Sequence, residues 1–488
     1  MVNWAILAPV IIYLVLVYII GYYSYAFVSK AKAGKGEGFL SEFFLSGRDL
    51  GGFVLAMTLV ATYVSAGSFV GGPGTAYVMG LGWVFLAMSQ MPTGYLTLAM
   101  LGKKFAIIAS KIKAITIVDF LRQRYESNAV AVIGSIAIVV FLIASMVAQW
   151  VGAARVLQAV GFSYHVGLAV FAITVLIYVT VGGFRAVALT DALQGTVMLI
   201  ATVAIIVMTI AVGGGVSNIV KEMYNTDPAL ITPYGPKNFI AVPWICSFWV
   251  LVGIGIAGLP QIALRAMAYK TSQAMHRAIL IGTPVAGFLM LGMHLAGAFG
   301  RVIVPGIQSG DLVIPTLTAK VFPPFFAGIF LAGPLAAIMS TVDSMLILVA
   351  SAIVKDLYLS ARPNTSDRSI ASLSTIVTAV IGILVFLLAI KPPSLLVWLN
   401  LFSIGGLEST FFWPIVLGLY WKRANGTGAL ASMIAGMGTY ILFDRVWSRP
   451  FGTHTVILPM LIALVVIVVV SILTKKPSEE VERRFWGV

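Results

Sequence analysis

One apolar stretch of the chain, GIFLAGPLAAIMSTVDSMLILVASAIVKDLY, carries oxygen-bearing side chains at helical spacing. Small and hydroxyl residues share one face with a flanking acid, namely Ala337, Ser340, Thr341, Ser344 and Asp343. Ser and Thr inside a buried helix often only bond the carbonyl one turn back. An adjacent Ser–Thr pair beside a buried carboxylate is more specific, because hydroxyls and free carbonyls are oxygen ligands that suit Na⁺. The stretch therefore predicts a cation site.

Two other apolar stretches are interrupted near their middle. The first carries SAGS at positions 65–68 and GGPG at 71–74, and the second carries GIGIAGLP at 253–260. Glycine permits many backbone conformations, and proline removes a hydrogen-bond donor and clashes with the preceding turn. Close helix packing through small residues is one interpretation. The other is a break whose freed carbonyls and amides bind an ion or a solute.

Composition shows where these stretches must lie. Hydrophobic residues make up 60% of the 488 residues and charged residues 10%, against about 45–50% and about 25% in soluble domains. The mean hydropathy is +1.02. A soluble protein of this length has too much surface to cover with so few charges, and a spanning helix needs about 20 mostly apolar residues. The chain is therefore predicted to be an all-α polytopic membrane protein in the lipid bilayer.

Apolar stretches bounded by charges, glycine or proline predict thirteen spanning helices. Their approximate limits are 4–27, 51–78, 80–102, 129–157, 165–183, 190–213, 239–262, 277–301, 325–354, 369–390, 395–420, 427–444 and 455–474. With the N-terminus outside, 23 of the 31 Lys and Arg fall in inner loops or the tail. Adding or removing one span breaks this asymmetry. We therefore expect a multi-pass protein of the plasma membrane with an outer N-terminus and a cytoplasmic C-terminus.

The two interrupted stretches are the second and seventh of these helices, so they cross the membrane in opposite directions. Interrupted helices at matching places in two halves are typical of inverted-repeat transporters. We predict one transmembrane domain, 1–488, whose core repeats are helices 2–6 and 7–11, at about 51–213 and 239–420. The peripheral helices are 4–27, 427–444 and 455–474.

Other intramembrane polar residues each admit two interpretations. Asp191, at the start of a helix, is either a charge favoured by the helix dipole or a cation relay near the inner exit. Arg155 either extends its charge to the membrane surface or clamps an anionic substrate. Gln90 and Glu408 fit helix contacts and function equally well. His294 fits a packed polar contact better than a proton relay.

Several classes of function lack the residues they need. The net charge of +14 fits cytoplasmic loops rather than nucleic-acid binding. The single cysteine excludes a disulfide framework within the chain, and the four histidines lack metal-ligand spacing. No nucleotide-binding loop or catalytic triad is present, so no enzyme is expected. Residues 213–239 are expected to form a surface loop, and the charged tail after residue 474 is expected to be mobile.

Long segments spread through the chain carry a family resemblance: FLSGRDLGGFVLAMTLVATYVSAGSFVGGPGTAY, LGKKFAI, GGFRAV, TDALQG, MHLAGAFGR, DLVIPTL, AGIFLAGPLAAIMST, KDLY, KPPSLLVWLN and GLYWKRANGTGA. Over nearly its whole length the chain resembles the sodium:solute symporter family, and within it the sodium/pantothenate symporters. The resemblance implies a leucine-transporter-type fold and a secondary transporter that imports pantothenate with Na⁺. Sodium would be the coupling ion, and no cofactor is expected. Another small carboxylate or an amino acid such as proline is the alternative substrate.

The resemblance also implies the site residues. Its sodium ligands are backbone and hydroxyl oxygens, on Ala61, Val64, Ala337, Ser340 and Thr341. A second sodium site, or a sodium exit, falls on Asp191, Asp343 and Ser344. Substrate contacts fall on Ser65, Ser68, Gln90 and Arg155.

Two positions depart from the family pattern. Gln261 follows Pro260 where many members have His, and Asp343 stands where the closest pantothenate carriers are expected to have Asn. Both bear on substrate identity and on the number of sodium ions. A channel and a membrane sensor are the other functional classes. An internal inverted repeat favours a carrier over a channel, and the lack of an appended cytoplasmic domain argues against a sensor.

Overall fold

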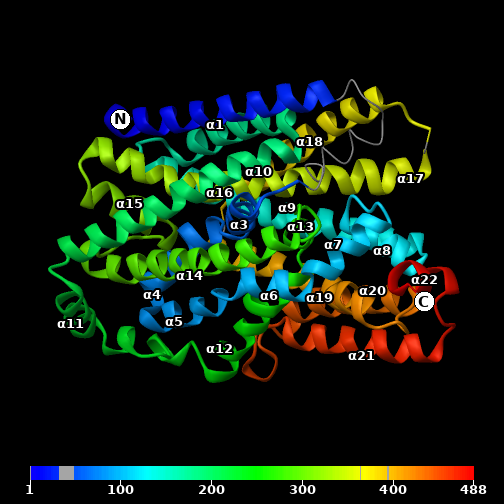
Figure 1. Ribbon diagram of the computed structural model, residues 1–488. Helices are drawn as coiled ribbons and strands as arrows, with labels where there is room; N and C mark the ends of the chain where they lie inside the picture. Colours follow the sequence, from blue (N-terminus) through cyan, green and yellow to red (C-terminus); the bar gives the residue numbers. More distant parts are fainter. Residues whose placement is uncertain (1, 32–48, 363, 393–394, 488) are drawn as a thin grey trace.

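A computed structural model describes residues 2–31, 49–362, 364–392 and 395–487 of the protein (Figure 1). The described residues are helices and connections without a named strand, and their one isolated bridge joins Leu50 to Tyr269. The long helices are α1 (Trp4–Ala31), α9 (Asn128–Ala159), α10 (Tyr164–Val212), α14 (Ser272–Ile303), α16 (Pro324–Ser351), α18 (Asp367–Ala389), α19 (Leu396–Tyr420), α20 (Gly426–Val446) and α21 (Ile457–Leu473).

Two spans consist of several short helical pieces. The first is built from α3 (Gly52–Tyr63), η2 (Gly67–Gly71) and α4 (Gly72–Met79). The second is built from α12 (Val242–Phe248), η6 (Trp249–Ile254), η7 (Gly255–Gly258) and α13 (Pro260–Arg265).

The remaining helices connect or flank these spans. They are α5 (Leu81–Ala87), η3 (Met88–Gln90), α6 (Thr93–Met100), α7 (Gly102–Lys111), α8 (Ile117–Tyr125), α11 (Val216–Thr226), η4 (Pro228–Ile231), η5 (Pro236–Asn238), η8 (Gly310–Leu312), α15 (Val313–Val321), η9 (Ala352–Tyr358), α17 (Leu359–Ala361), η10 (Pro450–Gly452) and α22 (Glu479–Trp486).

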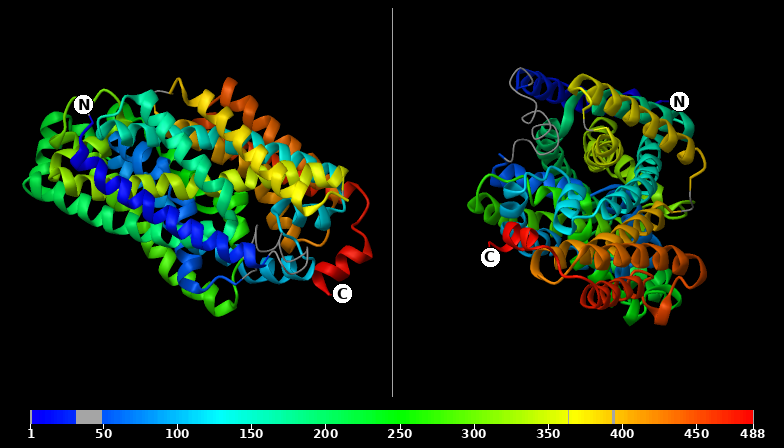
Figure 2. Two further views of the ribbon diagram at one scale, coloured as in Figure 1. Left: turned by 90° about the horizontal axis from the view of Figure 1, so that it is seen from above. Right: turned by 90° about the vertical axis from the view of Figure 1, so that its right-hand side faces the viewer.

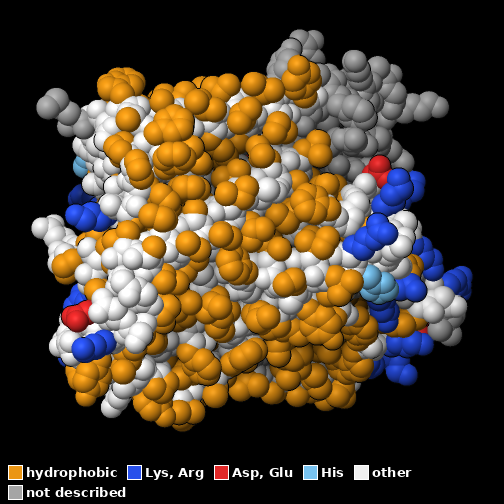
Figure 3. Space-filling model, turned by 60° about the vertical axis from the view of Figure 1, so that its left-hand side comes forward, with side chains coloured by type: hydrophobic (Ala, Val, Ile, Leu, Met, Phe, Trp, Pro, Cys, Tyr) orange, Lys and Arg blue, Asp and Glu red, His pale blue; other side chains and the backbone are white. Residues whose placement is uncertain are grey.

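The helices are set for a membrane. Within the described part of the chain, seven helices are long and apolar enough to cross a membrane, or up to nine if each bent pair of helices counts as one span. Four shorter apolar helices are also present. On the face in Figure 3, hydrophobic side chains cover the middle, and Lys and Arg gather at the left and right edges. Lipid-facing apolar side chains and charged ends are what a bilayer requires. The two termini lie at opposite ends of the bundle (Figures 1 and 2).

Helix starts follow the sequence closely. Polar side chains that accept a backbone N–H of the first turn cap many helices, among them those of Thr116, Ser127, Ser163, Thr271, Ser366, Asn425 and Ser478. Such a cap satisfies one of the amides that a helix leaves unpaired at its start.

The centre of the bundle is α16, which packs against α1, α3, α9 and α10. Apolar side chains gain nothing by leaving lipid, so helices in a membrane associate mainly through close packing. Small residues in the contact permit this packing. A Cβ added at Gly333 would lie only 2.4 Å from Cβ of Ala201 in α10. The predicted cation face of α16 is therefore held deep inside the protein.

Helix α10 covers both predicted spans 165–183 and 190–213, and its apolar segments Tyr164–Ile177 and Val187–Val212 are distinguished as separate helices. Two expectations about connections are corrected. The predicted surface loop 213–239 contains the helix α11, whose Ile219 and Met223 are buried one turn apart. The tail forms α22, which packs on α8 through buried Val481 and Phe485. In both short helices an apolar pair at i, i+4 spacing supplies the packing face.

Candidate functional site

The first broken span frees backbone oxygens inside the protein. Helix α3 ends at Tyr63, and Val64 is extended with φ −75° and ψ 115°. The helical pieces on the two sides of the break are bent by 65°. Carbonyls in the last turn of a helix have no partner within the helix. The carbonyls of Ala61 and Val64 are thus available at this break.

Helix α16 brings two hydroxyls to these carbonyls. The Ser340 hydroxyl oxygen lies 2.8 Å from the carbonyl oxygen of Ala61 and 3.1 Å from that of Ala337. The Thr341 hydroxyl oxygen lies 3.2 Å from the carbonyl oxygen of Val64 and 2.9 Å from that of Ala337. All five residues are buried. The structure therefore brings together the five oxygens named for the sodium site.

These five oxygens outnumber the protons among them. Each hydroxyl has one proton to donate, whereas three carbonyl oxygens and the carbonyl of Ala336 surround the pair. A cation bound to the lone pairs would satisfy every oxygen at once. The donor set is neutral and made only of oxygens, which suits Na⁺.

A second polar cluster lies one helical turn along α16. The Ser344 hydroxyl donates to the Ser340 carbonyl at 3.1 Å and lies 3.4 Å from the Thr62 hydroxyl. The Asp191 carboxylate accepts a 2.5 Å hydrogen bond from Thr58. The two clusters are thus joined through α3 and α16.

A fully buried arginine stands between the residues named for the second sodium site. The Arg265 guanidinium, from α13 just after the second break, lies 3.4 Å from the Asp191 carboxylate. The same nitrogen donates to the Ser344 hydroxyl at 2.6 Å. Asp343 is also buried, but it precedes Ser344 and is rotated from it by about 100° around the helix axis. The positive charge between Asp191 and Ser344 is therefore supplied by the protein.

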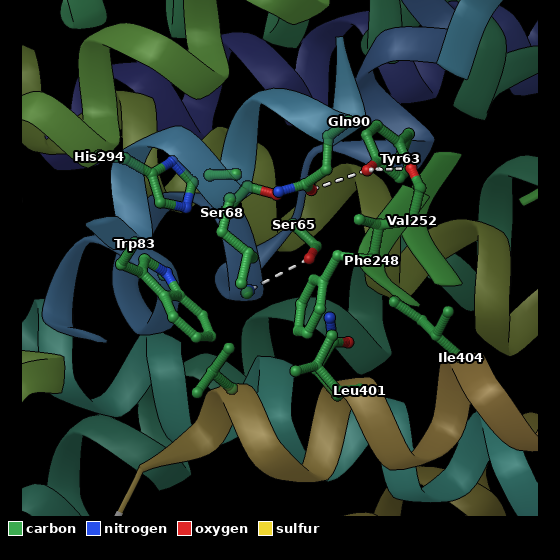
Figure 4. A pocket seen from close by; sticks show the side chains of 16 residues that line it. Tyr63, Ser65, Ser68, Trp83, Gln90, Phe248, Val252, His294, Leu401 and Ile404 are labelled. Atoms are coloured by element: carbon green, nitrogen blue, oxygen red, sulfur yellow. Dashed lines mark hydrogen bonds between the residues drawn. The ribbon is translucent and has the colours of Figure 1, made fainter. Parts of the chain in front are cut away.

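A cavity of about 450 Å³ of empty space, its mouth included, lies beside the first break (Figure 4). Ser65, Ser68 and Gln90, which were named as substrate contacts, all line it. Other polar side chains in the lining are Tyr63, His294 and Asn400.

Aromatic rings form part of the cavity wall. Trp83 and Phe248 line the cavity and meet edge-on, with ring centroids 5.9 Å apart. Trp83 also meets Trp398 edge-on at 5.9 Å. Such rings offer apolar surface to a solute while excluding water from its polar contacts.

Arg155 does not reach the cavity. Its guanidinium lies over the Tyr164 ring at 5.2 Å and donates to the Gln158 side chain at 3.0 Å. The lining of the cavity does not include it. Arg155 lies near the C-terminal end of α9, where Tyr164 and Gln158 hold it.

Several residues near the site were not singled out from the sequence. Arg265 was counted in a cytoplasmic loop, and Asn400 and Gln149 were not considered. A charged residue directly after a broken span was the available signal for Arg265. His294 was expected only to pack, but it lines the cavity.

Glu408 of α19 is a further buried acid. Neither carboxylate oxygen has a hydrogen-bond partner among the described residues. A Cβ added at Gly255 of the second broken span would lie 2.5 Å from one of these oxygens. The acid therefore packs directly against the second break.

Comparison with known proteins gives the class. The model of the sodium:solute symporter family matches residues 43–436. The sodium/pantothenate symporter of Haemophilus influenzae is 47% identical over 438 residues, covering 89% of this chain and 90% of its own. The sodium/pantothenate symporter of Escherichia coli (strain K12) is 46% identical over 425 residues, covering 86% and 88%. This chain belongs to the sodium:solute symporter family, and the relatives named here are transporters rather than enzymes.

A solved structure confirms the fold. A Na⁺-coupled sialic acid symporter in a substrate-bound outward-open state matches with a TM-score of 0.77 at 19% identity. The match covers 98% of this chain and 99% of that one. The predicted all-α, leucine-transporter-type fold is therefore correct.

Proposed function

We propose that this protein imports pantothenate together with Na⁺ across the plasma membrane by alternating access. One observation carries the proposal: the five-oxygen cluster and the polar-lined cavity share the break after Tyr63. The 47% identity to a sodium/pantothenate symporter supports the choice of solute.

The sodium ion is proposed to bind the carbonyls of Ala61, Val64 and Ala337 and the hydroxyls of Ser340 and Thr341. These groups come from α3 and α16, which belong to opposite halves of the proposed inverted repeat, 51–213 and 239–420. An ion bound between them stabilises the conformation in which the two halves meet at this point. A difference in affinity between conformations is what couples an ion to a solute.

We propose that Asp191, Asp343 and Ser344 line the sodium exit rather than form a second sodium site. Arg265 already supplies a positive charge between Asp191 and Ser344. A second cation at the same place would be repelled by the guanidinium.

The substrate is proposed to contact Ser65, Ser68 and Gln90 in the cavity. Arg155 is left out because it lies outside the lining. Thirteen spans with an outer N-terminus and a cytoplasmic C-terminus are supported by the bias of Lys and Arg and by the termini at opposite ends. Helices 4–27, 427–444 and 455–474 are peripheral in this scheme.

Uptake of labelled pantothenate by cells that produce the protein, in Na⁺ and in K⁺ medium, tests the proposal. Uptake that requires Na⁺ supports it. No pantothenate uptake beside Na⁺-dependent uptake of proline would replace the substrate with an amino acid.

A further inference from the structure

The backbone amide of Ala66 fixes the polarity of a chain of side-chain amides. This N–H lies in the break of the first span and donates to the Gln149 side-chain oxygen at 2.7 Å. A backbone N–H can only donate, so the oxygen of Gln149 must face Ala66. The nitrogen of Gln149 must therefore point the other way.

That nitrogen meets Asn400 of α19. The Gln149 nitrogen lies 3.4 Å from the Asn400 side-chain oxygen, which also accepts from the Ser145 hydroxyl at 3.0 Å. With its oxygen engaged twice, Asn400 turns its NH₂ group away from both donors. A Cβ added at Gly67 would lie 2.6 Å from this nitrogen, so the NH₂ group lies against the break. Asn400 lines the cavity.

A second amide, Gln90, lies in the cavity lining. Its side-chain oxygen lies 2.7 Å from the Tyr63 hydroxyl, as Figure 4 shows, and the same hydroxyl lies 3.4 Å from the Val252 carbonyl oxygen. When Tyr63 donates its one proton to the shorter contact, the Gln90 NH₂ group is left as a donor in the cavity lining. No Lys or Arg is present among the described residues that line the cavity. The donors available to an anion are therefore neutral: side-chain amides, hydroxyls and the indole N–H of Trp83, which has no hydrogen-bond partner among the described residues.

His294 contributes a hydrogen-bond acceptor to the cavity. Its Nδ1 lies 2.7 Å from the Met290 carbonyl oxygen, and a carbonyl can only accept, so Nδ1 carries a proton. In the neutral ring Nε2 is then an acceptor, and it faces Gly72 of α4 at the cavity. Figure 4 places His294 on the left and Gln90 and Tyr63 on the right. The cavity thus offers amide donors and a separate acceptor.

From this polarity we infer that Asn400, assisted by Gln90, binds the carboxylate of the substrate through its side-chain NH₂ group. His294 Nε2 accepts from a hydroxyl or amide N–H of the same molecule. The inference rests on the proposed function, because it names the side chains with which the proposed site recognises its substrate. Hydrogen bonds from neutral amides replace a cationic clamp, and such bonds are stronger to a charged group than to a neutral one.

The same relay ties substrate to ion. Ala66 lies two residues after Val64, whose carbonyl belongs to the proposed sodium site. An ion that holds Val64 also holds the amide that orients Gln149 and, through it, Asn400. Sodium binding therefore orients the Asn400 NH₂ group, which donates to the substrate carboxylate, although the ion does not contact the substrate.

The test compares pantothenate with its uncharged alcohol analogue, which has a hydroxyl in place of the carboxylate. Dissociation constants are measured on the purified, folded protein in Na⁺ buffer. Asn400→Asp replaces the donor by a negative charge of the same shape. We expect the preference for pantothenate over the alcohol to fall at least tenfold.

A remote variant tests the relay itself. Gln149→Glu keeps an acceptor for Ala66 but offers Asn400 a second acceptor, so Asn400 should rotate and present its oxygen to the cavity. We expect the preference for pantothenate to fall in the same direction, although Gln149 does not line the cavity. This variant also carries the test if Asn400→Asp fails to fold.

Asn425→Asp is the matched control. Asn425 is a buried asparagine that caps α20 and donates to Thr474, far from the cavity lining. The preference of the Asn425→Asp variant for pantothenate over the alcohol should match that of the unchanged protein. The inference is overturned if Asn400→Asp and Gln149→Glu weaken both ligands equally. If the unchanged protein binds no pantothenate, the proposed substrate is wrong, and the same comparison is then made with proline and its alcohol.

Discussion

The Thr341 hydroxyl oxygen lies 3.2 Å from the carbonyl oxygen of Val64, although 277 positions separate the two residues in the chain. The contact joins the break of one span to the centre of another. It exists because Val64 is extended, which turns its carbonyl out of the helical register. A bound ion at this point therefore fixes the relative position of two helices.

Removal of either hydroxyl should weaken the binding of sodium rather than the binding of substrate. For Ser340→Ala and Thr341→Ala we expect the Na⁺ concentration for half-maximal uptake to rise about tenfold or more, since a bond to a charged group contributes about 1.5–3 kcal/mol. The substrate KM should recover as Na⁺ is increased. Sodium titrations of initial uptake rates measure both quantities.

Ser351→Ala is the control for these variants. Ser351 is also buried in α16, but its hydroxyl bonds the Leu348 carbonyl of its own helix. Its sodium dependence should stay unchanged. If Ser340→Ala and Thr341→Ala behave like Ser351→Ala, the sodium site lies elsewhere.

Arg155 should prove dispensable for recognition of the carboxylate. Because its guanidinium contacts Tyr164 and Gln158 outside the cavity, Arg155→Lys should change the KM for pantothenate by less than about twofold. Initial rates at saturating Na⁺, normalised to the amount of protein in the membrane, measure this. A large rise in KM for pantothenate, but not for its alcohol analogue, would restore the clamp.

Removal of one partner of the buried Asp191–Arg265 pair should be strongly destabilising. Arg265→Ala leaves Asp191 buried without its counter-charge, a change that costs about 3–5 kcal/mol. The exposed pair of Lys270 and Asp49 is the comparison, and Lys270→Ala should cost no more than about 1 kcal/mol. Unfolding in detergent measures both. Equal losses from the two variants would show that the buried pair is not needed for stability.

The sequence predicted the parts of the site that lie along single helices. The Ser340–Thr341 pair and the small residues around Ser65 are local patterns, so the sequence alone is enough to indicate them. The relay from Ala66 through Gln149 to Asn400 joins three different spans, so no spacing along the chain reveals it. The sequence likewise does not show that Arg155 contacts Tyr164 and Gln158 instead of the cavity, because this depends on how α9 packs against its neighbours.

Asp311 should give the protein a pH-dependent stability. It lies in η8, outside the spans, where burial raises the pKa of Asp311 to about 6 against the opposing effects of the Leu396 N–H and Arg155. Its folded pKa lies above the ordinary value of 3.8, so the folded state binds this proton more tightly. The resulting stability is full below pH about 4 and is lost as the pH rises to about 6.

The comparison variant is Asp311→Asn, which stays neutral at every pH. The melting temperature of the unchanged protein relative to Asp311→Asn should fall between pH 4 and pH 6 and then level off. A difference that is constant across this range would show that Asp311 has an ordinary pKa.

The most direct test of ion–solute coupling is uptake of labelled pantothenate into proteoliposomes that contain only the purified protein. Entry of the anion against an inside-negative potential costs about 2.3 kcal/mol per 100 mV, and one co-transported Na⁺ cancels that charge. We predict that pantothenate accumulates above its external concentration only with an inward Na⁺ gradient. Equal uptake when K⁺ replaces Na⁺ would contradict sodium coupling.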